Sequence, residues 1–236
     1  MTGHSSSINS SPILRLGKNA MAGMLMAAIS LALSANADAR SEYWQQKVTL
    51  FNILPIEEGD IVFLGNSITD GGEFAELFHN PKIKNRGINS DVISGVRERL
   101  YQVTDHNPSK IFLLIGINDI SHGHSVEKLA ADYETLVKEI RQQSPKSVLY
   151  VQSIMPINND FGRYKNLRGK ERTIKELNAR LKDIARQNNA TFIDLTPALS
   201  DQATGKLRKD FTNDGLHLLG KGYKAWAEAI SPMISE

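Results

Sequence analysis

The sequence of 236 residues contains no cysteine and no apolar run long enough to cross a membrane comfortably. Without cysteine the chain cannot form a disulfide framework, a Cys-ligated zinc site, a thiol nucleophile or a lipid-modified N-terminal cysteine. Hydrophobic residues make up 41% and charged residues 23%, which excludes collagen-like, disordered and coiled-coil chains. The length suits one domain of about 200 residues, or at most two small ones.

The first 37 residues lack acidic side chains and have the parts of a bacterial secretory signal peptide. Arg15 and Lys18 precede the apolar stretch MAGMLMAAISLAL at 21–33, and residues 35–37 form a small-x-small cleavage site. The stretch is short for a bilayer of roughly 30 Å, although a buried helix or an uncleaved anchor would have a similar composition. We predict that residues 1–37 are a signal peptide with a polar N-terminal extension, and that the mature protein is periplasmic or secreted.

The positive net charge of the chain comes from this segment. The formal net charge of the whole chain is +2 at pH 7. Without Arg15 and Lys18, the formal net charge of residues 38–236 is zero. A neutral domain has no electrostatic reason to bind nucleic acid or an anionic membrane. We therefore expect no nucleic-acid partner and no stable membrane insertion after signal cleavage. The sequence leaves the oligomeric state open.

Residues 38–236 alternate between short apolar runs and segments of helical periodicity. Continuous apolar strands separated by helices indicate a parallel sheet covered on both faces. No repeat, linker or low-complexity tract interrupts this pattern after residue 40, so we predict a single α/β domain. Strands are expected at 60–65, 82–88, 110–116, 147–154 and 191–195, and helices at 41–54, 93–105, 125–143, 166–187 and 222–230.

Candidate catalytic residues follow the predicted strands, where open parallel sheets bind their ligands. Ser67 follows the first strand, and a serine hydroxyl becomes a nucleophile when a base removes its proton. His217 suits the role of base and Asp214 that of its orienting carboxylate, since they lie three residues apart in a glycine-containing turn. Ser67 alone would also fit a helix cap, and the Asp214–His217 pair would also fit a surface contact.

Donors for a developing oxyanion also follow the first three strands. The carboxamide of Asn118 comes directly after the third strand, and backbone N–H groups are expected at Ser67 and Gly87. Losing one such donor typically lowers the rate by about 10²–10³-fold. Asn118 and Gly87 are also ordinary turn residues, which leaves a purely structural role open for both.

Two further segments are chemically suggestive. His122 and His124 could bind a metal, but no third ligand at a set spacing accompanies them, and we expect neither a metal nor a cofactor. Residues 158–172 are polar and include Arg163, Tyr164 and Arg168. That segment suits a carbohydrate or acidic substrate, or else an ordinary solvated loop.

Four segments together resemble the SGNH (GDSL-like) hydrolase family: GNSITDGG, NRGINSD, GINDI and DGLH. The resemblance covers roughly residues 58–232 and implies a flavodoxin-like three-layer α/β/α sandwich with a five-stranded parallel sheet. It implies that Ser67 is the nucleophile, His217 the base and Asp214 its orienter. The implied oxyanion hole consists of the N–H groups of Ser67 and Gly87 together with Asn118.

The resemblance also bears on the substrate. Asn66 stands where the family's name motif has an aspartate, a change that leaves the mechanism intact but can alter local hydrogen bonds. The GNSIT form resembles the branch with acetylhydrolase-like and sialate or carbohydrate O-acetylesterase-like members. We predict a secreted serine esterase that removes a short acyl group, acetyl above all, from a carbohydrate or similar alcohol.

Three alternatives remain at this stage. A lysophospholipase or thioesterase of the same family would need a long apolar groove. A flavodoxin-like protein would use residues 65–72 to hold an FMN phosphate, which would leave Asn118, Asp214 and His217 without a role. A catalytically inactive sugar-binding protein is the third alternative, although every catalytic position of the family is filled.

Overall fold

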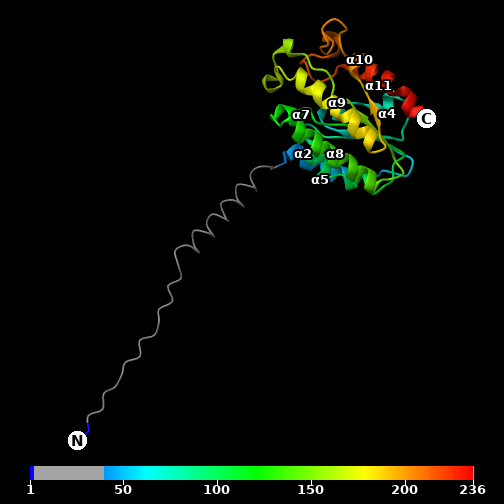
Figure 1. The fold of residues 1–236 in the computed structure, drawn as a ribbon. Coiled ribbons are helices and arrows are strands. Elements are labelled where there is room, and N and C mark those ends of the chain that lie inside the picture. Colours follow the sequence, from blue (N-terminus) through cyan, green and yellow to red (C-terminus); the bar gives the residue numbers. More distant parts are fainter. Residues whose placement is uncertain (3–39, 236) are drawn as a thin grey trace. The chain divides into compact units, whose positions relative to one another are not determined.

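The structure, a computed structural model, describes residues 1, 2 and 40–235 (Figure 1). Residues 3–37 of the predicted signal peptide therefore lie outside the described residues, and its boundary at residue 37 stays a prediction. From Ser41 onward the chain forms one compact unit. Within the described part of the chain, no helix is both long and apolar enough to cross a membrane.

Five parallel strands form the sheet, in the order β2-β1-β3-β4-β5. All five predicted strands are present, and β1 ends in register with β2 and β3, so that the segments after these three strands meet at one edge. The strands are β1 (Ile61–Gly65), β2 (Ile83–Gly87), β3 (Lys110–Leu114), β4 (Val148–Gln152) and β5 (Thr191–Ile193).

Helices cover both faces of the sheet, which confirms the predicted three-layer α/β/α arrangement (Figure 1). On one face α8 and α9 pack together, and on the other α11 contacts α4 and α10. The described helices are α2 (Glu42–Phe51), α3 (Ser67–Asp70), α4 (Phe74–Leu77), α5 (Ile93–Glu98), α6 (Tyr101–Thr104), α7 (Ile117–Ser121), α8 (Val126–Gln143), α9 (Glu171–Gln187), α10 (Thr196–Leu199) and α11 (Gly220–Ser235). Three 3-10 turns are η1 (Asn159–Phe161), η2 (Lys165–Leu167) and η3 (Lys209–Phe211).

A row of aromatic rings crosses one face of the sheet. Phe63, Phe112 and Tyr150 are paired in register on neighbouring strands, and their ring centroids lie 4.9 and 4.5 Å apart. Phe74 of α4 stacks on Phe63 at 4.0 Å, and Trp226 of α11 meets Phe74 edge-on at 4.9 Å. Helix α4 comes soon after β1, and α11 follows the segment with Asp214 and His217. This packing therefore brings two distant parts of the sequence to the same side of the sheet.

Four predicted helices differ from the structure. Helix α2 ends at Phe51 rather than at residue 54, and α11 spans Gly220–Ser235 rather than 222–230. The segment 93–105 forms α5 and α6 instead of one helix, and the break falls at Arg99, whose side chain turns into the interior. Helix α9 begins at Glu171 rather than at residue 166, because Gly169 adopts a left-handed conformation with φ +70° just before it. The short helices α3 and α7, directly after strands, were not predicted.

Arg99 takes part in a buried ion pair beneath the edge of the sheet. Its guanidinium lies 2.9 Å from the carboxylate of Asp91, and both side chains are wholly buried. Arg99 also donates to the carbonyl oxygen of Gly65 at 3.1 Å, while the indole N–H of Trp44 donates to Asp91 at 3.1 Å. The pair thus links helix α2, the end of β1 and the segment after β2.

The Arg99→Met variant should be much less stable than the wild type, because it leaves the Asp91 carboxylate buried without its cation. Removing one partner of a buried pair costs about 3–5 kcal/mol, whereas an exposed pair contributes about 1 kcal/mol or less. The matched control is Arg97→Met. Arg97 lies two residues before Arg99, and this variant breaks its exposed ion pair with Glu139. Urea unfolding should separate the two variants, and equal losses would contradict this account.

Candidate active site

Ser67 is the first residue of the short helix α3, immediately after Asn66 and the end of β1. Asn66 caps this helix, since its Oδ1 accepts the N–H of Ile68 at 3.1 Å. The capping role considered for Ser67 therefore belongs to Asn66, the residue that departs from the family motif. Ser67 itself is half-buried, and its hydroxyl borders a pocket.

Asp214 and His217 lie in a turn that is held by its own polar groups. Asp214 Oδ1 accepts the backbone N–H of Leu216 at 2.9 Å and that of His217 at 2.8 Å. The hydroxyl of Thr212 accepts the N–H of Gly215 at 2.9 Å. These bonds orient the Asp214 carboxylate and leave its second oxygen, Oδ2, directed at the imidazole of His217.

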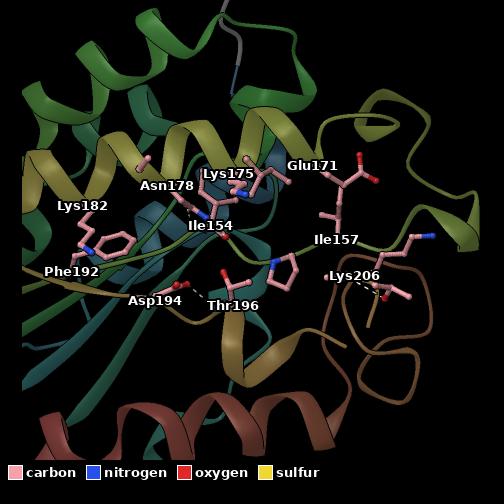
Figure 2. A pocket seen from close by; sticks show the side chains of 15 residues that line it. Ile154, Ile157, Glu171, Lys175, Asn178, Lys182, Phe192, Asp194, Thr196 and Lys206 are labelled. Carbon is pink, nitrogen blue, oxygen red and sulfur yellow. Dashed lines mark hydrogen bonds between the residues drawn. The ribbon is translucent and has the colours of Figure 1, made fainter. Parts of the chain in front are cut away.

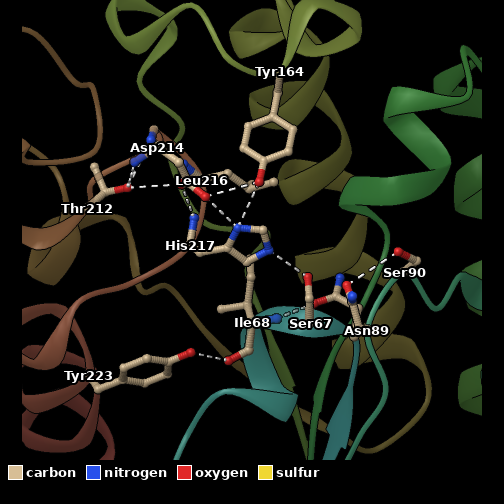
Figure 3. A network of polar contacts seen from close by, with 12 residues as sticks. Ser67, Ile68, Asn89, Ser90, Tyr164, Thr212, Asp214, Leu216, His217 and Tyr223 are labelled. Atoms are coloured by element: carbon tan, nitrogen blue, oxygen red, sulfur yellow. Dashed lines mark hydrogen bonds and ion pairs between the residues drawn. The ribbon is translucent and has the colours of Figure 1, made fainter. Parts of the chain in front are cut away.

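A continuous chain of hydrogen bonds joins Ser67, His217 and Asp214 (Figure 3). His217 Nδ1 lies 2.8 Å from Asp214 Oδ2, and His217 Nε2 lies 2.9 Å from Ser67 Oγ. Because an ionised carboxylate can only accept, Nδ1 carries the proton of a neutral imidazole and Nε2 can accept the hydroxyl of Ser67. The arrangement can therefore move a proton from the serine to the histidine.

The ionisation of Asp214 suits this arrangement. Burial acts to raise the pKa of the carboxyl, but the hydrogen bonds from the His217 side chain and from the backbone N–H groups of Leu216 and His217 outweigh it. Together they lower the pKa of Asp214 to about 2. Asp214 is thus a carboxylate at any ordinary assay pH.

The three predicted oxyanion donors differ in their hydrogen-bond partners. The N–H of Gly87 donates to Asn85 Oδ1 at 2.8 Å, and its role as an oxyanion donor stays a prediction. Glycine is needed there for space, since a Cβ would lie 2.2 Å from the backbone nitrogen of Asp70. Asn118 donates one hydrogen of its Nδ2 to the carbonyl oxygen of Asp91 at 2.8 Å, which fixes the carboxamide and leaves its second hydrogen. The N–H of Ser67 lies at the start of α3. The first N–H groups of a helix have no intrahelical partners.

Tyr164 reaches the same cluster from the polar segment after β4. Its hydroxyl lies 3.0 Å from Asp214 Oδ2 and 3.0 Å from His217 Nδ1. Its ring meets the imidazole edge-on, with centroids 5.7 Å apart. The sequence indicates Tyr164 only as a polar residue of that segment, because no local pattern signals a contact across 50 residues.

A pocket of about 520 Å³ opens over Ser67 and His217 and is also lined by Tyr43, Asp70, Gly71 and Asn89. Tyr43 and Lys47 extend from α2 to Asp70, with contacts of 2.7 Å each. The hydrogen bond to Asp70, together with burial, raises the pKa of Tyr43 to about 12, so this phenol keeps its proton. The wall of the pocket therefore carries polar side chains that a hydrogen bond and an ion pair hold in place.

A second pocket, of about 720 Å³, lies between α9, β5 and the turn at 200–206 (Figure 2). Ile154, Ile157 and Phe192 contribute apolar surface to it, and Lys175, Lys182 and Lys206 line it with charge. Its described lining contains neither serine nor histidine. The pairing of a nucleophile with a base is therefore found in the first pocket and not in this one.

His122 and His124 lie outside both pockets. Both side chains are exposed, and their ring centroids are 6.5 Å apart. Across residues 1, 2 and 40–235, no three His, Asp or Glu side chains gather as a metal would require. These two histidines therefore have no visible link to Ser67.

Comparison with known proteins identifies the family. The model of the GDSL-like Lipase/Acylhydrolase family matches residues 63–225, which begin within β1 and include Ser67 and His217. The chain belongs to this family. It is accordingly a carboxylic ester hydrolase, and the predicted resemblance and fold are confirmed.

Solved structures similar to this GDSL-like hydrolase include a Streptococcus pneumoniae protein provisionally described as a platelet activating factor. It is 28% identical, with a TM-score of 0.74 over 92% of this chain and 100% of the other. An acetylxylan esterase from Geobacillus stearothermophilus is 18% identical, with a TM-score of 0.60 over 77% and 96% of the two chains. That likeness shows the shared fold.

One curated relative of this chain is named for an activity other than ester hydrolysis. The N-acylneuraminate cytidylyltransferase of Escherichia coli is 26% identical over 183 residues. The match covers 74% of this chain but only 40% of the relative. The chain thus spans about 40% of that protein, and the name of that protein refers to its full length.

The Asp214 carboxyl of this hydrolase should stay ionised down to about pH 2. Its pKa in the folded state lies below the value of about 3.9 expected for an unfolded chain, so its stabilising contribution is complete above about pH 4 and is lost as the pH falls through 2. Carbon-13 NMR of the carboxyl groups, with Asp214→Asn to assign the signal, should show no titration of Asp214 above about pH 3. A midpoint near that of free aspartate would contradict the role given to these hydrogen bonds.

Proposed function

We propose that Ser67, His217 and Asp214 form a catalytic triad that removes short acyl groups, acetyl above all, from carbohydrates or similar alcohols. The observation that carries the proposal is the unbroken hydrogen-bond chain from Ser67 Oγ through both nitrogens of His217 to Asp214. An ester hydrolase of this kind needs an activated nucleophile, and a hydroxyl within hydrogen-bond distance of an oriented imidazole meets that need.

In the proposed mechanism, Ser67 Oγ attacks the ester carbonyl carbon while His217 Nε2 takes the hydroxyl proton. The tetrahedral intermediate then expels the alcohol, whose oxygen receives that proton from His217, and an acyl-Ser67 ester remains. Water attacks this ester with His217 again as the base, and the carboxylic acid leaves as Ser67 recovers its proton. Asp214 stays ionised throughout and stabilises the imidazolium at each stage.

Two donors support the oxyanion in this proposal. One is the backbone N–H of Ser67 at the start of α3, and the other is the free hydrogen of the Asn118 carboxamide. The hydrogen bond from Asn118 to Asp91 fixes the plane of the carboxamide before substrate arrives, which makes it a preorganised donor. Gly87 shapes the site through its small size, and its N–H, which donates to Asn85 Oδ1, stays a further predicted donor.

The pocket over Ser67 supports a short acyl group and a polar alcohol. Its described lining contains no aliphatic side chain, whereas Asp70, Asn89 and Tyr43 offer hydrogen-bonding groups. Such a surface can bind hydroxyl groups of a sugar but would bury little of a long acyl chain. This composition favours the carbohydrate esterase over the lysophospholipase or thioesterase alternative.

The solved structures add support of the same kind. Structures of the Geobacillus acetylxylan esterase include a serine-to-alanine and an aspartate-to-alanine catalytic mutant. A serine and an aspartate are therefore catalytic in a protein of this fold that acts on an acetylated polysaccharide. The proposal assigns the corresponding chemistry here to Ser67 and Asp214.

We also propose that the enzyme is exported to the periplasm or secreted. The basic flank, the apolar stretch and the small residues at 35–37 support this. Helix α2 begins at Glu42 and is capped by Ser41, whose Oγ accepts the N–H of Trp44 at 3.1 Å. A cut after Ala37 would therefore leave the helix and its cap intact.

Ser67→Ala should lose ester hydrolysis by about 10³-fold or more, because among the described residues no other hydroxyl lies within hydrogen-bond distance of His217 Nε2. Hydrolysis of p-nitrophenyl acetate measures the effect. Ser109→Ala is a suitable control, since Ser109 lies at the opposite end of the sheet, beside the first residue of β3. Equal turnover by wild type and Ser67→Ala would rule out the serine mechanism.

Asn118→Ala should lower kcat by about 10²-fold while KM changes little, because the carboxamide acts on the charge that develops during the reaction. Asn80→Ala, at the amino end of β2, should retain the wild-type rate. A variant in which only KM rises would instead assign Asn118 to binding of the ground state.

The specificity constant kcat/KM should fall by about tenfold or more from p-nitrophenyl acetate to the octanoate, since the pocket offers little apolar surface to a longer chain. Acetylated xylan or other acetylated sugars should be deacetylated at a rate that depends on Ser67. A preference for octanoate would favour the lysophospholipase or thioesterase alternative.

A further inference from the structure

Tyr164 makes two contacts with the candidate triad, and the protons involved can be assigned. The Asp214 carboxylate can only accept, so the Tyr164 hydroxyl donates its single proton to Asp214 Oδ2, 3.0 Å away. The phenol oxygen then presents its lone pairs to His217 Nδ1, also 3.0 Å away. The Nδ1 proton of His217 therefore lies between two acceptors, Asp214 and Tyr164.

The segment that leads to Tyr164 contacts the catalytic turn at Asn158. The N–H of Asn158 donates to the carbonyl oxygen of Gly215 at 2.8 Å, and Asn158 Nδ2 donates to the carbonyl oxygen of Leu207 at 2.8 Å. A Cβ on Gly215 would lie only 2.2 Å from the Asn158 carbonyl oxygen. The two backbone segments therefore approach each other as closely as glycine allows. Leu167, in the 3-10 turn that follows Tyr164, is buried.

The phenol of Tyr164 can act as a donor under assay conditions. Burial raises its pKa, and the hydrogen bond to Asp214 and the charge of that carboxylate raise it further, whereas the nearby Arg163 opposes them. The hydroxyl of Tyr164 therefore remains protonated at neutral pH. Its ring also packs edge-on against the imidazole of His217, with centroids 5.7 Å apart.

We propose that Tyr164 is a positioning residue of the reaction, which holds the imidazole of His217 and the carboxylate of Asp214 in their catalytic alignment. A ring anchored at Nδ1 by two acceptors cannot swing away from Ser67 as easily as a ring anchored by one. This inference rests on the proposed triad. It adds that the segment after β4 completes the site rather than merely bordering it.

Tyr164→Phe tests the inference, because it removes the hydroxyl and keeps the ring. With p-nitrophenyl acetate, kcat should fall roughly tenfold, the equivalent of one hydrogen bond, while KM stays within about twofold. Tyr101→Phe is the matched control, since Tyr101 is partly exposed and donates its hydroxyl proton to Asn52 at 2.9 Å. It should leave both constants unchanged.

Proton NMR of His217 provides a second readout that a purely structural role would not alter. In Tyr164→Phe the Nδ1 proton has Asp214 as its one remaining acceptor, and Asp214 has lost a donor, so the Nδ1–H···Oδ2 bond should strengthen. The resonance, assigned by its loss in His217→Ala, should move downfield relative to the wild type and to Tyr101→Phe. A wild-type kcat with an unmoved resonance would overturn the proposal, and so would a change in KM alone.

The triad itself is tested in parallel by Ser67→Ala. If Ser67→Ala is inactive and Tyr164→Phe behaves as the wild type, the role of Tyr164 is wrong and the triad stands. If Ser67→Ala is fully active, the triad fails, and the inference about Tyr164 fails with it.

Discussion

The close approach of helix α3 to the ends of β1 and β2 is the constraint on which the site depends. Gly65 and Gly87 are paired in register, and a Cβ on either would lie within 2.3 Å of neighbouring atoms, among them the carbonyl oxygen of Leu114 and the nitrogen of Asp70. Larger residues would push α3 outward. Because Ser67 Oγ lies 2.9 Å from His217 Nε2, an outward shift of about 1 Å would break this contact and with it the proposed proton transfer.

Asp91 connects this edge to the rest of the fold through three separate contacts. Its carboxylate pairs with Arg99 and accepts the indole N–H of Trp44, and its carbonyl oxygen accepts the carboxamide of Asn118. Helix α2, which carries Trp44 and Tyr43, therefore supports the Asn118 side chain indirectly and forms part of the pocket wall. The same helix would become the first element of the mature enzyme if the signal peptide is removed where the sequence predicts.

The sequence predicts the centre of the sheet well because β1 and β3 are buried on both faces and so form continuous apolar runs. The candidate residues Ser67, Asn118 and His217 could also be found, since the loops and turns after parallel strands gather at one edge of the sheet. The hydrogen bond from the Gly87 N–H to Asn85 could not be inferred from the place of Gly87 at the end of a strand, because it is a local bond that the sequence permits but does not require. The contact of Tyr164 with the triad could not be found from the sequence, because it depends on how the segment after β4 folds back on a turn 50 residues away.

The central claim is that Ser67 is the nucleophile activated by His217. The most direct measurement is mass spectrometry of the intact and digested enzyme after reaction with a serine-directed organophosphate. The account predicts a single adduct on the peptide that contains Ser67, absent in Ser67→Ala and formed far more slowly in His217→Ala. An adduct on another residue, or equal labelling of wild type and Ser67→Ala, would contradict it.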